Sequence, residues 1–287
     1  MRLPERDAGR RHRQWLRRAP WFLLGGLLLL FICLQDTPQI ERVTIGSPSS
    51  PLDVPITIVQ LSDLHMQGRR DVLRLKYALE LVEREHPDAV VLTGDFVRED
   101  ATQVNLAAPL LARLSAPLGT YAVLGNHDLW TNRHIVTEAL QSARVIVLDN
   151  KGVVLSNGSA ALYLAGLDDA WSGTADLPAA TRDNVTGLPV VMLVHEPDLG
   201  ATFVQAGSAW LQLSGHSHGG QVRLPGRGAL ILPDYARRYD QGLYSIGEGW
   251  LYVNRGLGTT TVPIRLGCRP EVTVLTIYPP AAAQELP

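Results

Sequence analysis

Cysteine is scarce in this chain of 287 residues, which contains only Cys33 and Cys268. Two cysteines are too few for a disulfide framework or for a zinc site built from thiolates. A strong excess of one charge is also missing, because 26 basic and 28 acidic residues leave a formal net charge of -2. That balance argues against a nucleic-acid-binding protein that relies on bulk attraction to phosphates. Hydrophobic residues make up 46% of the chain, which is enough to bury a sizeable core and excludes wholesale disorder.

The chain also lacks an apolar run of the ~20 residues that a membrane-spanning helix usually needs. Its longest run covers only residues 21–34 and follows a basic segment over residues 1–20. This order is typical of a signal peptide, yet no small-residue cleavage site follows, since residues 34–51 contain no alanine. We therefore expect residues 21–38 to form an uncleaved signal anchor or transmembrane helix. A buried or interfacial helix is the alternative.

The basic segment predicts the orientation of that anchor. Residues 1–20 contain seven arginines against Glu5 and Asp7. Positively charged flanks stay in the cytoplasm, so the rest of the chain is expected to be translocated. These features predict a protein of the inner (cytoplasmic) membrane, with a single N-terminal anchor and its main domain on the extracytoplasmic side.

Beyond the anchor, the sequence predicts a linker over residues 39–55, one domain over residues 56–278 and a frayed tail over residues 279–287. Short β-branched runs alternate with helical patterns, and this alternation indicates an α/β layered fold. Strands are expected at residues 56–61, 89–92, 121–124, 190–194, 210–213 and 272–277, and helices near residues 72–82, 105–114 and 135–140.

Five of the apolar runs end within a few residues in Asp, His or Asn. In α/β sheets, ligands gather outside the carboxyl ends of strands, so these runs would bring their polar side chains to one edge. Each motif is weak by itself, because a single histidine after a strand is more often structural than a metal ligand. The ordered series is Asp63-Leu64-His65, Gly94-Asp95, Gly125-Asn126-His127-Asp128, His195 and Gly215-His216-Ser217-His218-Gly219.

This series resembles the calcineurin-like metallophosphoesterases over about residues 56–278. The resemblance implies a layered α/β/β/α sandwich, preceded here by one N-terminal hydrophobic helix. Three further motifs look like the bacterial membrane-associated branch typified by the YkuE and YaeI proteins: Gly219-Gly220-Gln221, Asn254-Arg255-Gly256-Leu257-Gly258 and Arg269-Pro270-Glu271.

The same resemblance implies a metal-dependent phosphohydrolase with two divalent ions, whose bridging hydroxide would attack the phosphorus. Oxygen ligands mixed with imidazoles suit Mn, Fe or Zn. His127 would stabilise charge on the phosphoryl group or protonate the leaving oxygen, with Asp128 orienting its ring. The implied ligands form two sets that share Asp95 as a bridge: Asp63, His65 and His218 for one ion, and Asn126, His195 and His216 for the other.

Two other functions compete for the same residues. Residues 215–219 match the G-x-S-x-G nucleophile elbow of serine hydrolases, but that triad needs a later histidine and none follows His218. A fold retained only as a scaffold for protein partners should have lost ligands, whereas all seven and His127 are present. Asp168 and Asp169 are assigned no firm role, and Arg255 is a candidate to bind substrate oxygens through its guanidinium.

The predicted anchor would hold the site near lipid head groups, which favours phospholipids or lipid-linked phosphates as substrates. The alternative is UDP-2,3-diacylglucosamine, whose pyrophosphate bond members of this superfamily hydrolyse in lipid A synthesis; that substrate requires a cytoplasmic site. No nucleic acid and no obligate protein partner are indicated. The loops over residues 65–72, 98–104, 168–185 and 223–250 are expected to shape the choice of substrate.

Overall fold

The structure is a computed structural model that describes residues 35–46, 54–158 and 160–278. The predicted basic segment, most of the predicted anchor and the predicted tail lie outside these residues. Among the helices of the described ranges, none is long and apolar enough to cross a membrane.

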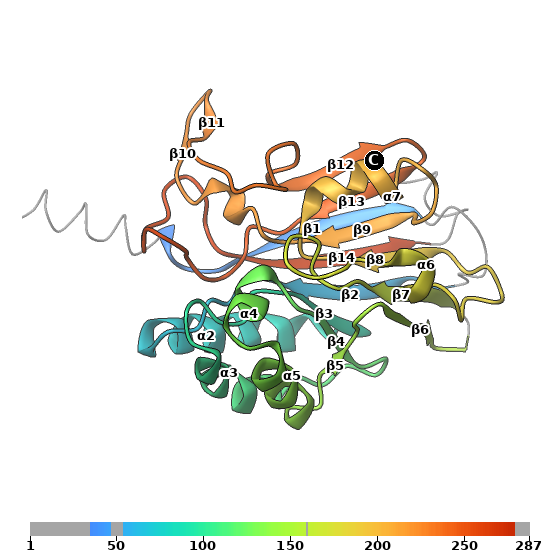
Figure 1. Cartoon of the computed structure of the whole chain (residues 1–287), viewed down its shortest axis with the longest axis horizontal. Coiled ribbons are helices and arrows are strands. Elements are labelled where there is room, and N and C mark those ends of the chain that lie inside the picture. Colours follow the sequence, from blue (N-terminus) through green and yellow to red (C-terminus); the bar gives the residue numbers. More distant parts are fainter. Residues whose placement is uncertain (1–34, 47–53, 159, 279–287) are drawn as a thin grey trace, which may run out of the picture.

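Two six-stranded sheets form the centre of the molecule (Figure 1). The first has the order β1-β14-β2-β3-β4-β5, in which β14 runs antiparallel to β2 and the other pairs are parallel. Its strands are β1 (Gln39–Gly46), β2 (Ile56–Leu61), β3 (Ala89–Thr93), β4 (Thr120–Val123), β5 (Ile146–Val147) and β14 (Glu271–Tyr278).

The second sheet has the order β12-β13-β9-β8-β7-β6, with parallel pairing from β13 to β7 and an antiparallel strand at each edge. A short hairpin, β10–β11, stands apart from both sheets. The strands are β6 (Lys151–Ser156), β7 (Ala161–Gly166), β8 (Val190–Leu193), β9 (Leu211–Ser214), β10 (Arg223–Leu224), β11 (Gly228–Ala229), β12 (Gly242–Ile246) and β13 (Gly249–Val253).

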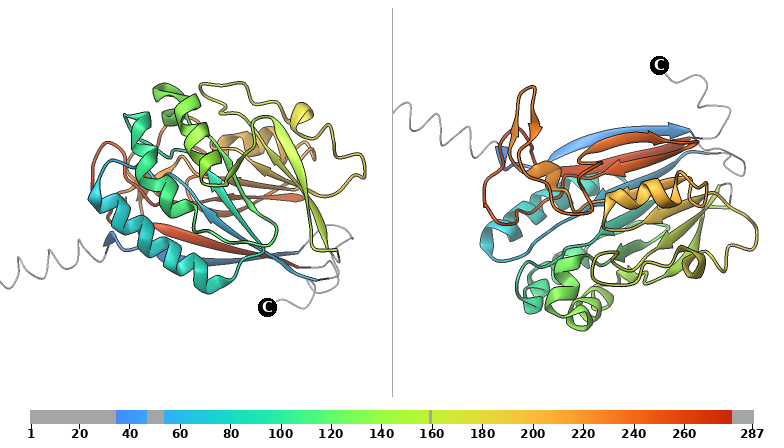
Figure 2. Two further views of the ribbon diagram at one scale, coloured as in Figure 1. Left: turned by 90° about the horizontal axis from the view of Figure 1, so that it is seen from below. Right: turned by 45° about the horizontal axis from the view of Figure 1, so that its top comes forward.

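Helices cover the outer face of each sheet, which gives the predicted order of layers, α/β/β/α (Figure 2). The first sheet is covered by α2 (Arg69–Glu85), α3 (Val104–Leu111), α4 (Asn126–Thr131) and α5 (Arg133–Ser142), and the second by the short α6 (Leu177–Ala180) and α7 (Gly200–Phe203). Three 3-10 turns complete the described elements: η1 (Ala101–Gln103), η2 (Pro197–Leu199) and η3 (His218–Gly220).

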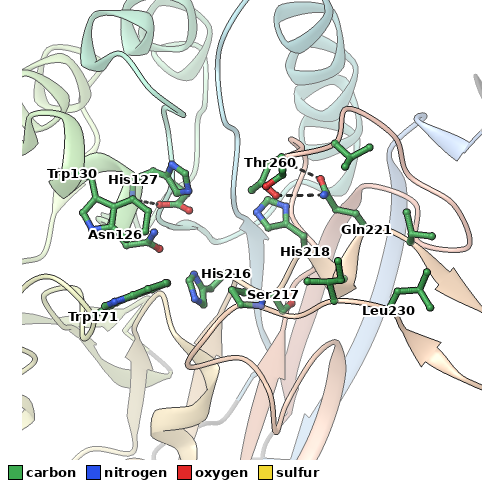
Figure 3. A pocket seen from close by; sticks show the side chains of 17 residues that line it. Asn126, His127, Trp130, Trp171, His216, Ser217, His218, Gln221, Leu230 and Thr260 are labelled. Carbon is green, nitrogen blue, oxygen red and sulfur yellow. Dashed lines mark hydrogen bonds between the residues drawn. The ribbon is translucent and has the colours of Figure 1, made fainter.

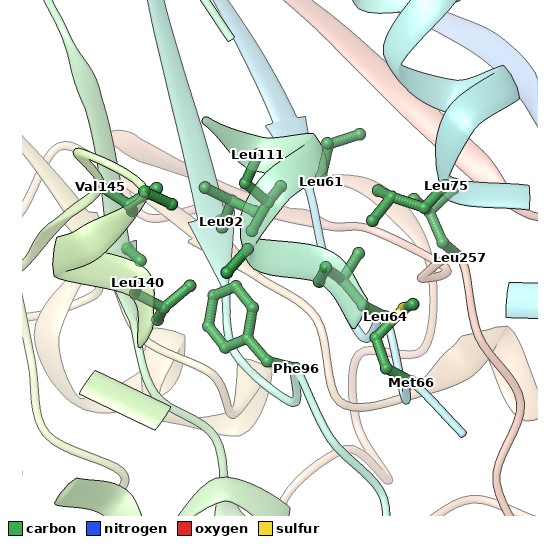
Figure 4. Packing of buried hydrophobic residues seen from close by; sticks show 14 of the residues in the cluster. Leu61, Leu64, Met66, Leu75, Leu92, Phe96, Leu111, Leu140, Val145 and Leu257 are labelled. Atoms are coloured by element: carbon green, nitrogen blue, oxygen red, sulfur yellow. The ribbon is translucent and has the colours of Figure 1, made fainter. Parts of the chain in front are cut away.

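Strand β2 shows how the sequence builds these layers. Alternate side chains of a strand point to opposite faces. Ile56 and Ile58 therefore pack between the two sheets, whereas Val59 and Leu61 pack under the helices with Leu75 of α2 (Figure 4). Both faces of β2 are buried, which explains why apolar residues occur on both faces of the strand rather than on alternate positions only.

The predicted boundaries before residue 56 are wrong in two places. Residues 39–46, assigned to a linker, form β1, which pairs along its whole length with β14. Residues 35–38, assigned to the anchor, pack on the domain: Asp36 accepts a hydrogen bond from buried Arg74 at 2.8 Å. Polar residues lie on both faces of β1, at Gln39, Glu41, Arg42 and Thr44, so a search for apolar runs does not reveal this edge strand.

Candidate metal centre

The carboxyl ends of parallel strands from both sheets meet at one edge, as the sequence predicts. Strands β2, β3 and β4 of the first sheet lead into Asp63, Asp95 and Asn126. Strands β8 and β9 of the second sheet lead into His195 and His216. All seven predicted ligands are buried at this junction.

Four of these residues form a first group that could hold a cation, with one ligand atom from each lying within 4.8 Å of all the others. His65 Nε2 faces His218 Nε2 at 3.0 Å, and His218 Nε2 lies 3.3 Å from Asp63 Oδ1. The backbone amide of His216 donates to both oxygens of Asp63 and so fixes that carboxylate. The fourth member of the group is Asp95.

A second group contains Asp95, His195 and His216 and satisfies the same distance limit. Asp95 Oδ2 lies 3.1 Å from His195 Nε2 and 3.4 Å from His65 Nε2, so one carboxylate oxygen lies beside a nitrogen of each group. The other oxygen, Oδ1, accepts a hydrogen bond from the backbone amide of His127 at 2.9 Å. This geometry is what a bridging ligand requires.

Hydrogen bonds at the far ring nitrogens leave free the atoms that a metal needs. His195 donates from Nδ1 to the carbonyl of Thr93, and His216 donates from Nε2 to the carbonyl of Asp234. Such contacts fix the tautomer of a metal-binding histidine. Among the described residues, Asn126 Oδ1 is a buried polar atom without a hydrogen-bond partner. Buried polar atoms are normally paired, so these residues fit a pair of divalent cations.

Two of the candidate imidazole ligands are already neutral in the metal-free protein, whereas His195 carries a proton that a cation would displace. Burial lowers the pKa of both His65 and His216 to about 3, so these imidazoles are neutral near pH 7 and offer a lone pair. Burial also acts to lower the pKa of His195, but the adjacent Asp95 carboxylate outweighs it and holds that pKa well above its usual range. Burial raises the pKa of Asp63 to about 6.

The backbone is strained where the ligands lie. Five of the seven predicted ligands have a positive φ, a region that side chains other than glycine rarely adopt. Such strain is found where a surrounding structure holds functional side chains in place. Gly215 contributes by its lack of a side chain, because a Cβ there would collide with Ser62 Oγ and Asp63 Oδ2. The strained ligands are Asp63, His65, Asp95, His216 and His218.

His127 lies beside the ligands, at the start of α4. Its ring is 4.8 Å from that of His65, and its Nδ1 lies 2.7 Å from the carbonyl oxygen of Arg98, which leaves Nε2 for the cavity. The predicted contact from Asp128 to this ring is wrong. Asp128 instead accepts hydrogen bonds from three backbone amides, those of Phe96, Val97 and Gly125, and so joins the loops after β3 and β4.

Arg255 does not reach the site. Its guanidinium donates to Glu271 of β14 and to Glu41 of β1, and it is largely buried between them. The candidate role in binding substrate oxygens is therefore wrong. Through these contacts, Arg255 links β1 and β14, at the edge of the first sheet, to the loop after β13.

Asp168 and Asp169 support one wall of the site. Asp168 accepts from the backbone amides of Asp169 and Thr174, and Asp169 accepts from that of Ser172. Buried Glu196, which the sequence did not reveal, accepts from the amide of Trp171. Its position directly after His195 was the only available signal. Together these carboxylates hold the loop that carries Trp171.

A cavity of about 460 Å³ opens onto the centre (Figure 3). Trp130 and Trp171 form one wall, with ring centroids 5.1 Å apart, and Trp171 lies edge-on to His216. Residues 220–222, 230–231, 233 and 260–262 supply most of the opposite wall. Two loops predicted to shape the site, residues 168–185 and 223–250, do contribute, whereas residues 65–72 and 98–104 do not line this cavity. The segment 260–262 was not predicted.

The calcineurin-like phosphoesterase family model matches residues 56–220, more than half of the chain and the part that carries every candidate ligand. The chain belongs to the calcineurin-like phosphoesterase family. With the ligand cluster described above, this membership makes the protein a metal-dependent phosphohydrolase.

Relatives extend the match beyond residue 220. The chain is 37% identical over 225 residues to the uncharacterized metallophosphoesterase YkuE of Bacillus subtilis, a match that covers 77% of this chain and 78% of that protein. It is 36% identical over 229 residues to the phosphodiesterase YaeI of Escherichia coli, covering 78% and 82%. The resemblance to this branch is thus confirmed.

A solved structure supports the fold alone. The 5'-nucleotidase precursor from Thermus thermophilus superposes with a TM-score of 0.51 at 14% identity. The match covers 81% of this chain but only 57% of the nucleotidase, so the chain spans little more than half of that protein.

Proposed function

We propose that this chain is a membrane-anchored phosphoesterase that uses two divalent ions to hydrolyse phosphate esters of lipids. The observation that carries the proposal is the joining of a buried cluster of ligands to an apolar cavity. The ligand cluster suits the phosphate group of such a lipid, and the apolar cavity suits its hydrocarbon part.

The proposed ligands keep the sets expected from the sequence. When bound, a pair of divalent ions lowers the pKa of water and neutralises charge on a phosphoryl group. Mn, Fe and Zn all suit the mixture of carboxylate, amide and imidazole donors. The sets are Asp63, His65 and His218 for one ion and Asn126, His195 and His216 for the other, with Asp95 shared.

His127 is the proposed general acid. The Arg98 carbonyl accepts a hydrogen bond from Nδ1 and so orients the ring, and the protonated form then presents an N–H at Nε2 toward the cavity. Nε2 can donate that proton to the leaving oxygen as the ester bond breaks. Asp128 acts indirectly in this scheme, because the loops that it joins carry both His127 and Asp95.

The lining of the cavity supports a lipid. Beyond the ligands and His127, most of the wall is aromatic or aliphatic. Apolar walls with a few polar groups at one end suit a molecule that has a charged head and a hydrocarbon body. A relative from Bos taurus, 32% identical over 239 residues, is described as a transmembrane protein with a metallophosphoesterase domain, and this description agrees with membrane attachment for the present chain. The apolar lining residues are Trp130, Trp171, Val222, Leu230, Ile231, Pro233 and Val262.

The proposed location is the extracytoplasmic side of the bacterial inner membrane, with the anchor in residues 21–38. The alternative substrate, UDP-2,3-diacylglucosamine, would also suit an apolar cavity but is available only in the cytoplasm. Fusions after residue 287 separate the two. Alkaline phosphatase should be active there and a cytoplasmic reporter inactive, and the opposite result would remove the translocated model.

Turnover of p-nitrophenyl phosphate and of its bis-ester tests the reaction class. The metal-stripped protein should be inactive, and activity should return when Mn is added. The ratio of the two rates then separates monoesterase from diesterase activity. If neither ester turns over while about two ions bind per chain, the proposed catalysis of simple phosphate esters is wrong.

A further inference from the structure

Exposed apolar side chains are concentrated around the mouth of the cavity. Of the sixteen large hydrophobic residues exposed in the described ranges, five lie in residues 224–231 and 262–264. Ile231 is 81% exposed, which is exceptional for an isoleucine. We define these five as the apolar rim: Leu224, Leu230, Ile231, Val262 and Ile264. Contiguous patches of this kind mark interaction sites more often than chance exposure does.

The two segments of the rim are held together by backbone contacts. The amide of Arg223 donates to the carbonyl of Leu266, and that of Leu266 donates to Gln221. The side chain of Gln221 also joins Thr260 by two hydrogen bonds (Figure 3). The hairpin β10–β11 therefore projects from the body of the molecule with the segment after β13 fixed beside it (Figure 1).

The described chain begins beside this rim. Gln35 accepts a hydrogen bond from the amide of Gly267, three residues beyond Ile264. Arg70 joins Asp36 to the carbonyl of Pro263, which lies between two rim residues. The apolar run over residues 21–34 ends immediately before Gln35. A membrane segment that ends there would leave the bilayer next to the rim.

We propose that the apolar rim docks on a phospholipid bilayer, so that the mouth of the cavity faces the head groups. The inference rests on the proposed function for its choice of a lipid substrate. Interfacial apolar groups enter a bilayer by ~5–10 Å, a depth that projecting side chains such as Ile231 could reach. Exposed Arg227, in the turn between β10 and β11, forms no ion pair within the described ranges and suits an anionic head group. Substrate would then enter from the membrane plane.

Depth-dependent fluorescence quenching tests the docking without any need for activity. The full chain carrying Cys33→Ser receives one new cysteine, Leu224→Cys or Ile264→Cys, labelled with bimane. Val185→Cys is the matched control, because Val185 is 89% exposed and follows α6 at the other end of the molecule (Figure 1). The proteins are reconstituted in phosphatidylcholine vesicles with and without phosphatidylglycerol, using spin-labelled phosphatidylcholine as the quencher. Labels on the rim should be quenched about threefold more than the control, because only they reach the acyl region.

Negative charges introduced into the apolar rim should prevent it from docking on the bilayer. The double variant Leu224→Asp/Ile264→Asp, labelled at Arg227→Cys, should lose quenching, whereas Val185→Asp with the same label should keep it. Leu224 and Ile264 do not line the cavity, so turnover of p-nitrophenyl phosphate should be unchanged in the double variant.

Equal quenching at positions 224, 264 and 185 would overturn the proposal, as would retained quenching in the double variant, because the anchor alone would then hold the protein. If only the rim labels are quenched but the protein hydrolyses neither ester, docking on the bilayer is supported and the proposed catalysis is contradicted.

Discussion

Asp95→Asn is the sharpest test of the proposed centre, because this carboxylate belongs to both groups of candidate ligands. The change keeps the size of the side chain and an oxygen that can still accept the hydrogen bond from the amide of His127. It removes one negative charge and one oxygen atom that could bind a metal ion. The fold should therefore survive while the electrostatics of the centre change.

The expected loss follows from counting charges. The group with Asp63 and His65 retains one carboxylate after the substitution, whereas the group with His195 and His216 retains none. Two unit charges ~4 Å apart interact by about 4 kcal/mol at an effective dielectric constant near 20. Each 1.4 kcal/mol is a factor of ten. The affinity of the second group for a divalent ion should thus fall by at least ~10³-fold, and turnover should fall with it.

Metal content after dialysis against a weak chelator, measured by elemental analysis, gives the first readout. The variant should retain about one ion per chain or fewer, with activity too low to measure. Asp149→Asn is the matched control, because Asp149 is half exposed and pairs with Arg133 away from the ligands. Two tightly bound ions in Asp95→Asn would refute the bridging role, whatever the activity.

Four further outcomes are expected. His127→Ala should retain both ions but lose ~10²-fold or more in turnover, as removal of a general acid does; unchanged turnover would exclude it from the chemistry. Gly215→Ala should lower stability by ~1–3 kcal/mol in thermal unfolding through the clash with Asp63, whereas Gly68→Ala, whose Cβ meets nothing within 4 Å, should cost less, because only the preference of the α2 N-cap for glycine over alanine is lost. Burial raises the pKa of the Cys268 thiol, so in the Cys33→Ser protein it should react with iodoacetamide at pH 8 only after unfolding, and rapid labelling of that folded protein would contradict its burial. Chelation should lower the melting temperature, since ions at 100 times their Kd stabilise by ~2.7 kcal/mol; an unchanged midpoint would argue against tight binding.

The centre could be predicted from the sequence because its ligands follow buried strands of high β propensity. The runs before Asp63, Asp95 and His195 are apolar on both faces, so they are recognisable without knowledge of their partners. Once the strands are parallel, topology alone brings their carboxyl ends together. The spacing within each motif then places the ligands on the following turn.

Features that depend on exposed or irregular segments could not be predicted in this way. Strand β1 has polar residues on both sides and resembled a linker, and the hairpin β10–β11 has only two residues in each strand. Arg255 resembled a substrate ligand because its partners, Glu41 and Glu271, lie 214 and 16 residues away in the chain. No local sequence pattern predicts ion pairs between residues so far apart in the chain.

The arrangement of the ligands links catalysis to the fold itself. The first set takes Asp63 and His65 from the first sheet and His218 from the second, and the second set is likewise divided between the sheets. Bound ions would therefore join the two sheets at the edge where strained ligands and buried unpaired nitrogens weaken the metal-free protein. Because the ions would bind only the folded arrangement of the ligands, their binding free energy would also stabilise this edge of the two sheets. The same ions that act on the phosphate would hold Asp95 and His127 in position for the reaction.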